Sequence, residues 1–354
     1  MKKTLMLGNE AVARGLYEAG VTVVSSYPGT PSTEITENVV QYGDDVYCEW
    51  APNEKVAFEV AFGASTGGAR SFCAMKHVGL NVAADPLYTA SYIGVNAGMV
   101  CAVADDPGMH SSQNEQDSRH HAIAAKVPML EPSDSAECLA FTKLAYELSE
   151  QFDTPVLLRL STRISHSRSL VELSPREERP LKEYHKDVMK NVMMPAMARG
   201  AHVKVEKRTE ALRRWAETAS INTVEYNDKR IGIICAGTTY TYAKEALGER
   251  ASFLKLGMVN PLPVSLIVEF ARNVGQVYVI EELDDIIETH CRKHGVPVIG
   301  RLLFPAIGEY SQATVREALL GENRPYDAFE GDIPARPPVL CAGCPHRGLF
   351  YALK

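Results

Sequence analysis

Short apolar runs alternate with amphipathic stretches along the first 170 residues. The apolar runs have the length of strands, and the stretches between them have the apolar periodicity of helices. Predicted strands cover 21–27, 45–51, 70–79, 98–106 and 154–162, and predicted helices cover 10–20, 30–43, 53–68, 85–95 and 135–152. Strands that alternate with helices in this way indicate βαβ units and a parallel sheet. We therefore expect a doubly wound α/β domain over residues 1–168.

The pattern changes after this first domain. Residues 169–228 are charge-rich and predict a connector with amphipathic helices, whereas residues 229–320 return to alternating strands and helices and predict a second, smaller α/β domain. Residues 321–338 carry four prolines and predict a linker. After them come a short apolar run, a turn and the start of a helix. We expect residues 321–354 to comprise this linker and the start of a truncated third domain.

Composition narrows the class of function. The 354 residues are 45% hydrophobic and 23% charged, and the formal net charge is −7, without a long Lys/Arg block. Such a chain handles small molecules or proteins, and no nucleic-acid footprint is evident. Gly8-Asn9-Glu10 interrupts the first apolar run before a signal-peptide core forms, and no stretch reaches the roughly 18–20 apolar residues of a membrane helix. We expect a cytoplasmic protein that binds neither membranes nor nucleic acid.

The segment SSYPGTPSTEI, residues 25–35, ends a predicted strand in a turn of conformationally special residues. Gly29 permits a sharp turn, Pro31 suits the first position of a helix, and Thr30 then occupies the N-cap. Taken alone, the segment predicts a well-capped helix. Because ligands bind beyond the carboxyl ends of parallel strands, the alternative is that Thr30 contacts a carboxylate or a phosphate there.

Glu54 begins a predicted helix whose other positions are small and apolar. A first-turn acid is favoured by the helix dipole, and this is the simpler interpretation. The alternative is a functional one. Desolvation raises the proton affinity of a carboxylate, which suits a group that shares a proton with a bound heterocycle.

The loop over residues 104–122 follows a predicted strand and is dense in polar side chains. So many polar groups are costly to bury, so the loop forms either solvated surface or the wall of a binding site. Arg119 could clamp a substrate carboxylate through two parallel hydrogen bonds. The neighbouring His120 and His121 point apart and do not form a metal signature.

Cys341 and Cys344 form a C-x-x-C motif, whereas the other six cysteines are scattered along the chain. The motif is compatible with half of a zinc site, a redox pair or two ligands of an iron–sulfur cluster. Pro345 displaces His346 from the position that haem attachment requires. Because two cysteines cannot close a metal site, the partners must come from sequence outside this chain.

Several segments together resemble the 2-oxoacid:ferredoxin oxidoreductases, most closely the alpha subunits of the indolepyruvate ferredoxin oxidoreductases. They occur in that family's order: YPGTPSTEI, EWAPNEKVAFEVAFGAS, ADDPGMHSSQNEQDSRHHA with KVPMLEPSD, TPVLLRLSTRISHS, LGMVNPLP with VYVIEELDD, and CAGCPHRG. The resemblance implies that residues 1–168 form the pyrimidine-binding domain of a thiamine diphosphate enzyme. It also implies that residues 229–320 are similar to the carboxy-terminal domain of transketolase. Joint occurrence favours the functional interpretations over the simpler ones.

The resemblance also implies roles for single residues. Glu54 takes the position of the catalytic glutamate that hydrogen-bonds the aminopyrimidine ring of the cofactor. Pro28 and Gly29 belong to a turn that lies against this cofactor, and Thr30 in the same turn contacts the 2-oxoacid. Arg119 lies where a substrate-binding arginine is found, so we expect it to face Thr30 across a pocket.

For the C-x-x-C motif, the resemblance implies that Cys341 and Cys344 help to hold an iron–sulfur cluster. The sequence departs from the family pattern because it ends at Lys354. The Mg2+ site that accompanies thiamine diphosphate and most ligands of the [4Fe–4S] clusters are therefore expected outside this chain. This chain alone should be inactive.

The implied reaction is oxidative decarboxylation of arylpyruvates such as indolepyruvate to aryl-acetyl-CoA. Coenzyme A is a substrate, ferredoxin accepts the electrons, and the expected partners are a beta subunit and further copies of the chain. One alternative is another 2-oxoacid:ferredoxin oxidoreductase, acting on pyruvate or a branched-chain oxoacid. The other is a non-catalytic remnant or assembly subunit.

Overall fold

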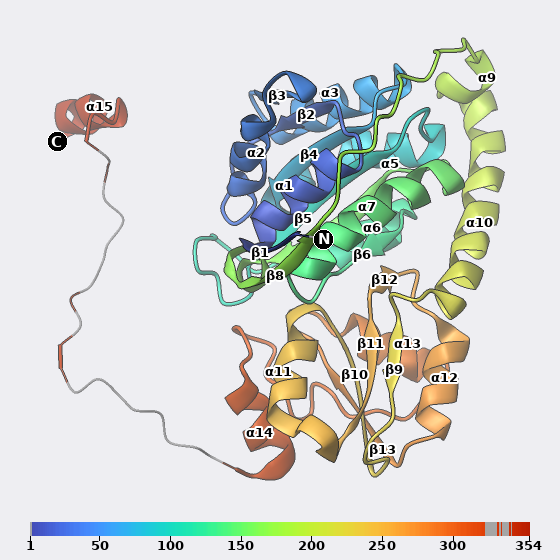
Figure 1. Cartoon of the computed structure of the whole chain (residues 1–354), viewed down its shortest axis with the longest axis vertical. Coiled ribbons are helices and arrows are strands. Elements are labelled where there is room, and N and C mark those ends of the chain that lie inside the picture. The colour runs from blue at the N-terminus through green and yellow to red at the C-terminus, as the bar shows by residue number, and fades with distance from the viewer. Residues whose placement is uncertain (1, 323–330, 333, 335–339, 341) are drawn as a thin grey trace. The chain divides into compact units, whose positions relative to one another are not determined.

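The computed structural model describes residues 2–322, 331–332, 334, 340 and 342–354 of the chain. The chain divides into two compact units, 1–322 and 323–354. Helix α15 (His346–Leu353) is the regular element of the second unit among its described residues. The first unit contains two sheets, each with helices packed on it (Figure 1).

The larger sheet has seven strands in the order β12-β6-β7-β5-β4-β2-β3. All neighbouring pairs are parallel except β12 with β6, which is antiparallel. The bounds are β2 (Val23–Ser26), β3 (Tyr47–Trp50), β4 (Ser71–Lys76), β5 (Met99–Asp105), β6 (Met129–Leu130), β7 (Val156–Ser161) and β12 (Met258–Asn260). The crossover connections lead from the central strands towards both edges of the sheet. The predicted doubly wound parallel sheet is therefore confirmed.

Helices cover both faces of this sheet because its central strands bury alternate residues on opposite sides. Phe72 and Ala74 of β4 pack with helices α1 and α7, whereas Cys73 and Met75 pack with α3, α4 and α5. The helices are α1 (Gly8–Glu18), α2 (Thr33–Val39), α3 (Glu54–Thr66), α4 (His77–Val82), α5 (Ala84–Ile93), α6 (Arg119–Ala125), α7 (Ser135–Phe152) and α8 (Thr162–His166). A short 3-10 helix, η1 (Val40–Asp45), extends α2.

The segment after the first domain differs from the predicted connector in its first part. Strand β8 (Arg168–Leu173) pairs antiparallel with β1 (Lys2–Leu7) at the amino terminus, and neither strand was expected from the sequence. The helical part is present as α9 (Val188–Asn191) and the 24-residue α10 (Pro195–Thr218). Helix α10 runs alongside both sheets (Figure 1) and contacts α5 at one end and α12 at the other.

The smaller sheet has four strands in the order β13-β10-β11-β9. Strands β13, β10 and β11 run parallel to one another. The edge strand β9 pairs antiparallel with β11. The strands are β9 (Thr223–Glu225), β10 (Ile231–Ala236), β11 (Ser252–Leu256) and β13 (Gln276–Ile280). The helices are α11 (Gly237–Leu247), η2 (Gly248–Arg250), α12 (Val264–Arg272), α13 (Ile286–Lys293) and α14 (Gln312–Leu320). A second α/β fold of this kind was predicted for this region.

The two sheets are joined by one continuous run of chain. Strand β11 belongs to the small sheet, and β12, which follows it after Gly257, closes the edge of the large one. The crossing point is crowded, because a Cβ atom on Gly257 would lie 2.5 Å from the carbonyl oxygen of Ile221 and 2.9 Å from the Phe141 ring. Tertiary packing thus divides this apolar stretch between two sheets.

Candidate functional site

Polar segments follow four neighbouring strands of the large sheet at the edge where these strands end. Strand β2 leads into the turn at residues 27–32, β3 into Asn53 and Glu54, β4 into His77, and β5 into the loop that begins with Asp106. Because parallel strands end at the same edge, these segments lie on one side of the sheet. This edge is the candidate site.

The turn after β2 differs in detail from the predicted helix cap. Helix α2 begins at Thr33 with Ser32 at its N-cap, so Thr30 is not the capping residue and Pro31 is not its first residue. Local hydrogen bonds explain the shift: the Thr33 hydroxyl accepts from the Gly29 amide at 2.9 Å, and the Ser32 hydroxyl donates to the Gly29 carbonyl at 2.9 Å. Thr30 is left exposed at the tip of the turn, free of a capping role.

Close packing fixes this turn on the neighbouring strand. A Cβ atom on Gly29 would lie 3.1 Å from the Cβ of Lys76, the last residue of β4. The Asn9 amide group on α1 donates to the Pro31 carbonyl at 2.7 Å from the other side. The turn that carries Pro28, Gly29 and Thr30 is therefore held against the carboxyl end of β4.

Glu54 is the first residue of α3, and its side chain is half-buried. The preceding Asn53 caps the helix by accepting from the Val56 amide at 3.0 Å, so Glu54 is not needed as a cap. No hydrogen bond or ion pair engages the Glu54 carboxylate among the described residues. A Cβ atom on Gly79 would lie 2.6 Å from Glu54 Cγ and 2.8 Å from Oε1. Glycine at position 79 thus leaves room for an uncommitted carboxylate, which fits a group that binds an external ligand.

We expect Gly79→Ala to displace the Glu54 carboxylate, because the new methyl group and the carboxylate cannot occupy the same space. The expected result is at least a tenfold loss of affinity for the thiamine diphosphate that the sequence resemblance implies, measured by titration of the cofactor-free assembly with cofactor. Gly63→Ala is the matched control, since Gly63 lies on α3 with open space around its Cβ position. Unchanged cofactor affinity in Gly79→Ala would show that this contact does not position Glu54.

Lys76 and His77 also lie at this edge, and the sequence analysis did not single them out. The Lys76 ammonium donates to the Ser111 carbonyl at 2.9 Å, and burial lowers its pKa although Asp106 nearby acts in the opposite direction. His77 Nε2 lies 3.2 Å from the Asn114 carbonyl oxygen, and its buried Nδ1 has no partner among the described residues. A lysine and a histidine directly after a buried strand are the signal that could have identified them.

The loop after β5 is anchored by Asp106. Its carboxylate accepts from the Ser111 amide at 2.9 Å, the Ser112 hydroxyl at 2.6 Å and the Thr162 hydroxyl at 2.5 Å. Burial alone would raise the pKa of Asp106, but these hydrogen bonds lower it. The carboxylate therefore stays ionised and holds the loop beside Lys76.

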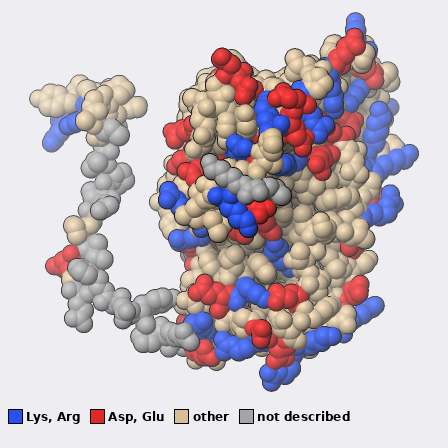
Figure 2. All heavy atoms as spheres, in the orientation of Figure 1, with Lys and Arg blue, Asp and Glu red and all other residues tan. Residues whose placement is uncertain are grey.

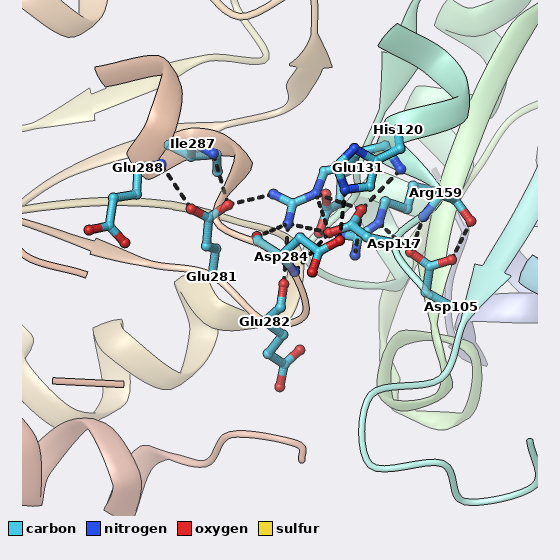
Figure 3. A network of polar contacts seen from close by, with 12 residues as sticks. Asp105, Asp117, His120, Glu131, Arg159, Glu281, Glu282, Asp284, Ile287 and Glu288 are labelled. Carbon is cyan, nitrogen blue, oxygen red and sulfur yellow. Dashed lines mark hydrogen bonds and ion pairs between the residues drawn. The ribbon is translucent and has the colours of Figure 1, made fainter. Parts of the chain in front are cut away.

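Arg119 lies in a different environment from the one predicted. It is the first residue of α6, only 1% exposed, and its guanidinium is shared by two carboxylates. Asp117 accepts from Nη2 at 2.6 Å, and Glu281 of the smaller α/β domain accepts from Nη1 at 2.7 Å. Backbone carbonyls of Glu282 and Asp284 accept further hydrogen bonds from Nη2. Figure 3 shows Asp117 and Glu281 approaching this centre from the two domains.

A second buried arginine extends the same network (Figure 3). Arg159 within β7 donates from Nε to Asp105 at 2.7 Å, and its Nη1 lies 2.7 Å from the Glu131 carboxylate. Burial by itself would raise the pKa of Asp117, but the charges of Arg119 and Arg159 lower it well below its usual range. The arrangement is a buried ionic junction between the two domains.

This geometry bears on the predicted substrate-binding role of Arg119. Each nitrogen of its guanidinium already donates to an oxygen of the chain itself. No hydrogen bond joins Arg119 to Thr30 among the described residues. A substrate carboxylate would have to displace Asp117 or Glu281. The structure therefore supplies a structural role for Arg119, and substrate binding by this residue stays a prediction.

The predicted iron–sulfur ligands lie in the second compact unit. Cys341 is outside the described residues, and Cys344 is half-buried with its Sγ 3.4 Å from His346 Nδ1. No group of three or more His, Cys, Asp or Glu side chains with metal-binding geometry occurs in the part of the chain that the structure describes. Cluster binding by these cysteines stays a prediction.

The surface carries mixed charge. On the face shown in Figure 2, basic and acidic side chains are interspersed over the first unit. Within the described residues, no helix is both long and apolar enough to cross a membrane.

Comparison with known proteins gives these geometric observations a context. The family described as "Pyruvate flavodoxin/ferredoxin oxidoreductase, thiamine diP-bdg" matches residues 14–227. The indolepyruvate oxidoreductase subunit IorA of Archaeoglobus fulgidus is 41% identical over 379 residues, covering 100% of this chain and 61% of the relative. The subunit of the same name from Methanothermobacter thermautotrophicus is 43% identical, covering 99% of this chain and 60% of the relative. The chain thus spans about three fifths of the length of these relatives.

The fold has counterparts among solved structures. A 2-oxoglutarate:ferredoxin oxidoreductase from Magnetococcus marinus, solved with 2-oxoglutarate, coenzyme A and succinyl-CoA bound, superposes with a TM-score of 0.75 at 18% identity. That match covers 90% of this chain and 65% of the other. A split-gene transketolase superposes with a TM-score of 0.56 at 16% identity, covering 89% of this chain and 96% of the other. At these low sequence identities, both superpositions show a similarity of fold alone.

Proposed function

Because the chain belongs to the pyruvate flavodoxin/ferredoxin oxidoreductase family of thiamine diphosphate-binding domains, we propose that it forms the pyrimidine-binding half of a thiamine diphosphate site. The observation that carries this proposal is the Glu54 carboxylate, which has no partner among the described residues and for which Gly79 leaves room. It lies at the carboxyl edge of a parallel sheet, where ligands of such folds bind.

When bound, thiamine diphosphate supplies the carbanion chemistry that decarboxylates a 2-oxoacid. This chain contributes the groups around the aminopyrimidine ring. Glu54 holds a proton between its carboxylate and the ring nitrogen, while Pro28 and Gly29 lie against the cofactor. Thr30, at the exposed tip of the same turn, donates a hydrogen bond to the substrate.

For the whole enzyme we propose oxidative decarboxylation of indolepyruvate and related arylpyruvates to aryl-acetyl-CoA. Coenzyme A accepts the acyl group, and ferredoxin accepts the electrons through [4Fe–4S] clusters. A beta subunit and further copies of the chain complete the assembly. The names of the two relatives at 41% and 43% identity support this choice of substrate.

The substrate carboxylate requires a cation at the site. Lys76 is better placed than Arg119 for this role, because its ammonium donates to one carbonyl only among the described residues, and its Cβ lies beside the turn that carries Thr30. An ammonium has three donors, so two remain for a substrate. Arg119, by contrast, is almost fully buried and already pairs with both Asp117 and Glu281.

The substrate assignment predicts a clear order of rates in the assembled enzyme. With coenzyme A present, reduction of a viologen dye should have a kcat/KM for indolepyruvate and phenylpyruvate at least tenfold above the values for pyruvate and 2-oxoglutarate. Rates are measured at equal substrate concentrations, and omission of coenzyme A is the control for acyl transfer. Equal values for pyruvate would contradict the arylpyruvate assignment, and no activity with any 2-oxoacid would favour an assembly subunit.

A further inference from the structure

A cavity lies away from the carboxyl edge that holds Glu54, and none of the site residues described above except the neighbours of Arg119 on α6 line it. It has a volume of about 640 Å3, which is within the range of small-molecule pockets. Its walls come from α6 of the large domain, from α10, and from the segments that open α12 and form α13 in the smaller domain. Figure 1 shows α10, α12 and α13 meeting beside the join between the two sheets.

The cavity has an apolar floor. Val259, Pro261, Leu262 and Ile286 line it, and Ile123 contributes a side chain that is 46% exposed. Because Ile123 is exposed and Ile286 is only half-buried, both side chains can present apolar surface to a ligand. This floor suits a hydrocarbon or aromatic body.

Basic groups line the rim of the same cavity. Arg213 and Lys293 are exposed there, and the only carboxylate in the lining is that of Asp285, which already accepts from the Thr289 hydroxyl at 3.1 Å. Arg213 has one long contact, 3.4 Å, with Glu210, and no ion pair engages Lys293 in the described part of the chain. Two cationic side chains thus stand against one carboxylate among the lining residues, which leaves a net positive charge beside the apolar floor.

The environment of His290 also favours binding of an anion in this cavity. Its Nε2 is buried and has no hydrogen-bond partner among the described residues, although the ring lines the cavity. Burial, together with smaller contributions from the charges of His294, Lys293 and Arg213, lowers the pKa of His290 to about 4. The imidazole is thus neutral at pH 7 and stands in a positive field. A neutral imidazole next to two cations can donate to an anionic oxygen.

We propose that this cavity binds a small organic anion, with its carboxylate between Arg213, Lys293 and His290 and its apolar body on the floor formed around Leu262 and Ile286. Such a ligand touches α6, α10 and both α12 and α13, so it bridges the two domains. The site does not use Glu54 or the turn that carries Thr30, so it is independent of the proposed cofactor site.

Octanoate is a suitable probe because it combines a carboxylate with an apolar body, and octylammonium has the same body with opposite charge. Isothermal titration calorimetry on the 354-residue chain should show one octanoate site with a Kd below about 1 mM and at least tenfold weaker binding of octylammonium. Arg213→Glu/Lys293→Glu should weaken octanoate binding at least tenfold. Arg214→Glu, at an exposed neighbour on α10 outside the cavity, is the control for reversing one nearby positive charge and should leave octanoate binding unchanged.

Three results would overturn the proposal: no octanoate site, equal binding of octylammonium, or full octanoate affinity in the double variant. The first two are measured on the unmodified chain, so they decide the question even if the double variant does not fold. Circular dichroism of the variants checks their folding. Inorganic phosphate serves as the head group alone and should compete only weakly, because it leaves the floor uncovered.

Discussion

Glu54→Gln should slow exchange of the C2 proton of bound thiamine diphosphate by about 10²–10⁴-fold, the usual contribution of general acid–base catalysis. Glutamine keeps the shape of the side chain but cannot take up the proton that a carboxylate shares with the ring nitrogen. Glu54 has no other visible task, since Asn53 caps α3 and no ion pair engages its carboxylate in the described residues. The measurement is deuterium exchange followed by NMR on acid-quenched samples of the assembled enzyme.

The matched control for this prediction is Glu59→Gln. Glu59 is an exposed residue on the same helix, and its one ion pair with any described residue is a 4.0 Å contact with Lys55. Both variants lose one negative charge on α3, so a general electrostatic effect would appear in both. Exchange at the normal rate in Glu54→Gln would remove Glu54 from the proposed role, whereas slow exchange in both variants would point to charge rather than to position.

The fold was largely predictable from sequence because its strands are short buried runs separated by helices. Residues such as Phe72 and Cys73 are both apolar, so a strand with two buried faces is visible as a continuous run. Strands β1 and β8 escaped prediction because they are half-exposed and pair over a separation of more than 150 residues. Strand β12 was not predicted as a separate strand of the large sheet, since nothing local marks where a chain leaves one sheet for another.

The placement of the candidate residues was predictable where it depends on position along a strand and its following turn. Glu54 and the turn at Thr30 follow β3 and β2 directly, so the parallel topology alone places them at one edge. Arg119 was different, because its role depends on which carboxylates tertiary packing brings to it. Glu281 lies 162 positions away along the chain and reaches it only through the junction of the two domains. Sequence reasoning identified the charged residue but not its partner.

The second large effect is expected at the buried ionic junction around Arg119. Arg119→Met should lower the free energy of unfolding by about 3–5 kcal/mol, because it leaves Asp117 and Glu281 buried without their shared cation. Urea unfolding followed by tryptophan fluorescence measures the change. Arg119→Met/Glu281→Met should recover part of the loss, since it removes one of the two stranded carboxylates together with the guanidinium.

Arg163→Met is the control, because it also removes an arginine that bridges the two domains. Arg163 pairs with Glu309 at 2.5 Å but is 53% exposed, so its loss should cost about 1 kcal/mol or less. The comparison separates burial from bridging, which are the two ways in which Arg119 could stabilise the fold. A stable Arg119→Met that binds the 2-oxoacid at least tenfold more weakly would reverse the assignment. In that case Asp117 and Glu281 would release the guanidinium when substrate enters, and Arg119 would be the residue that faces Thr30.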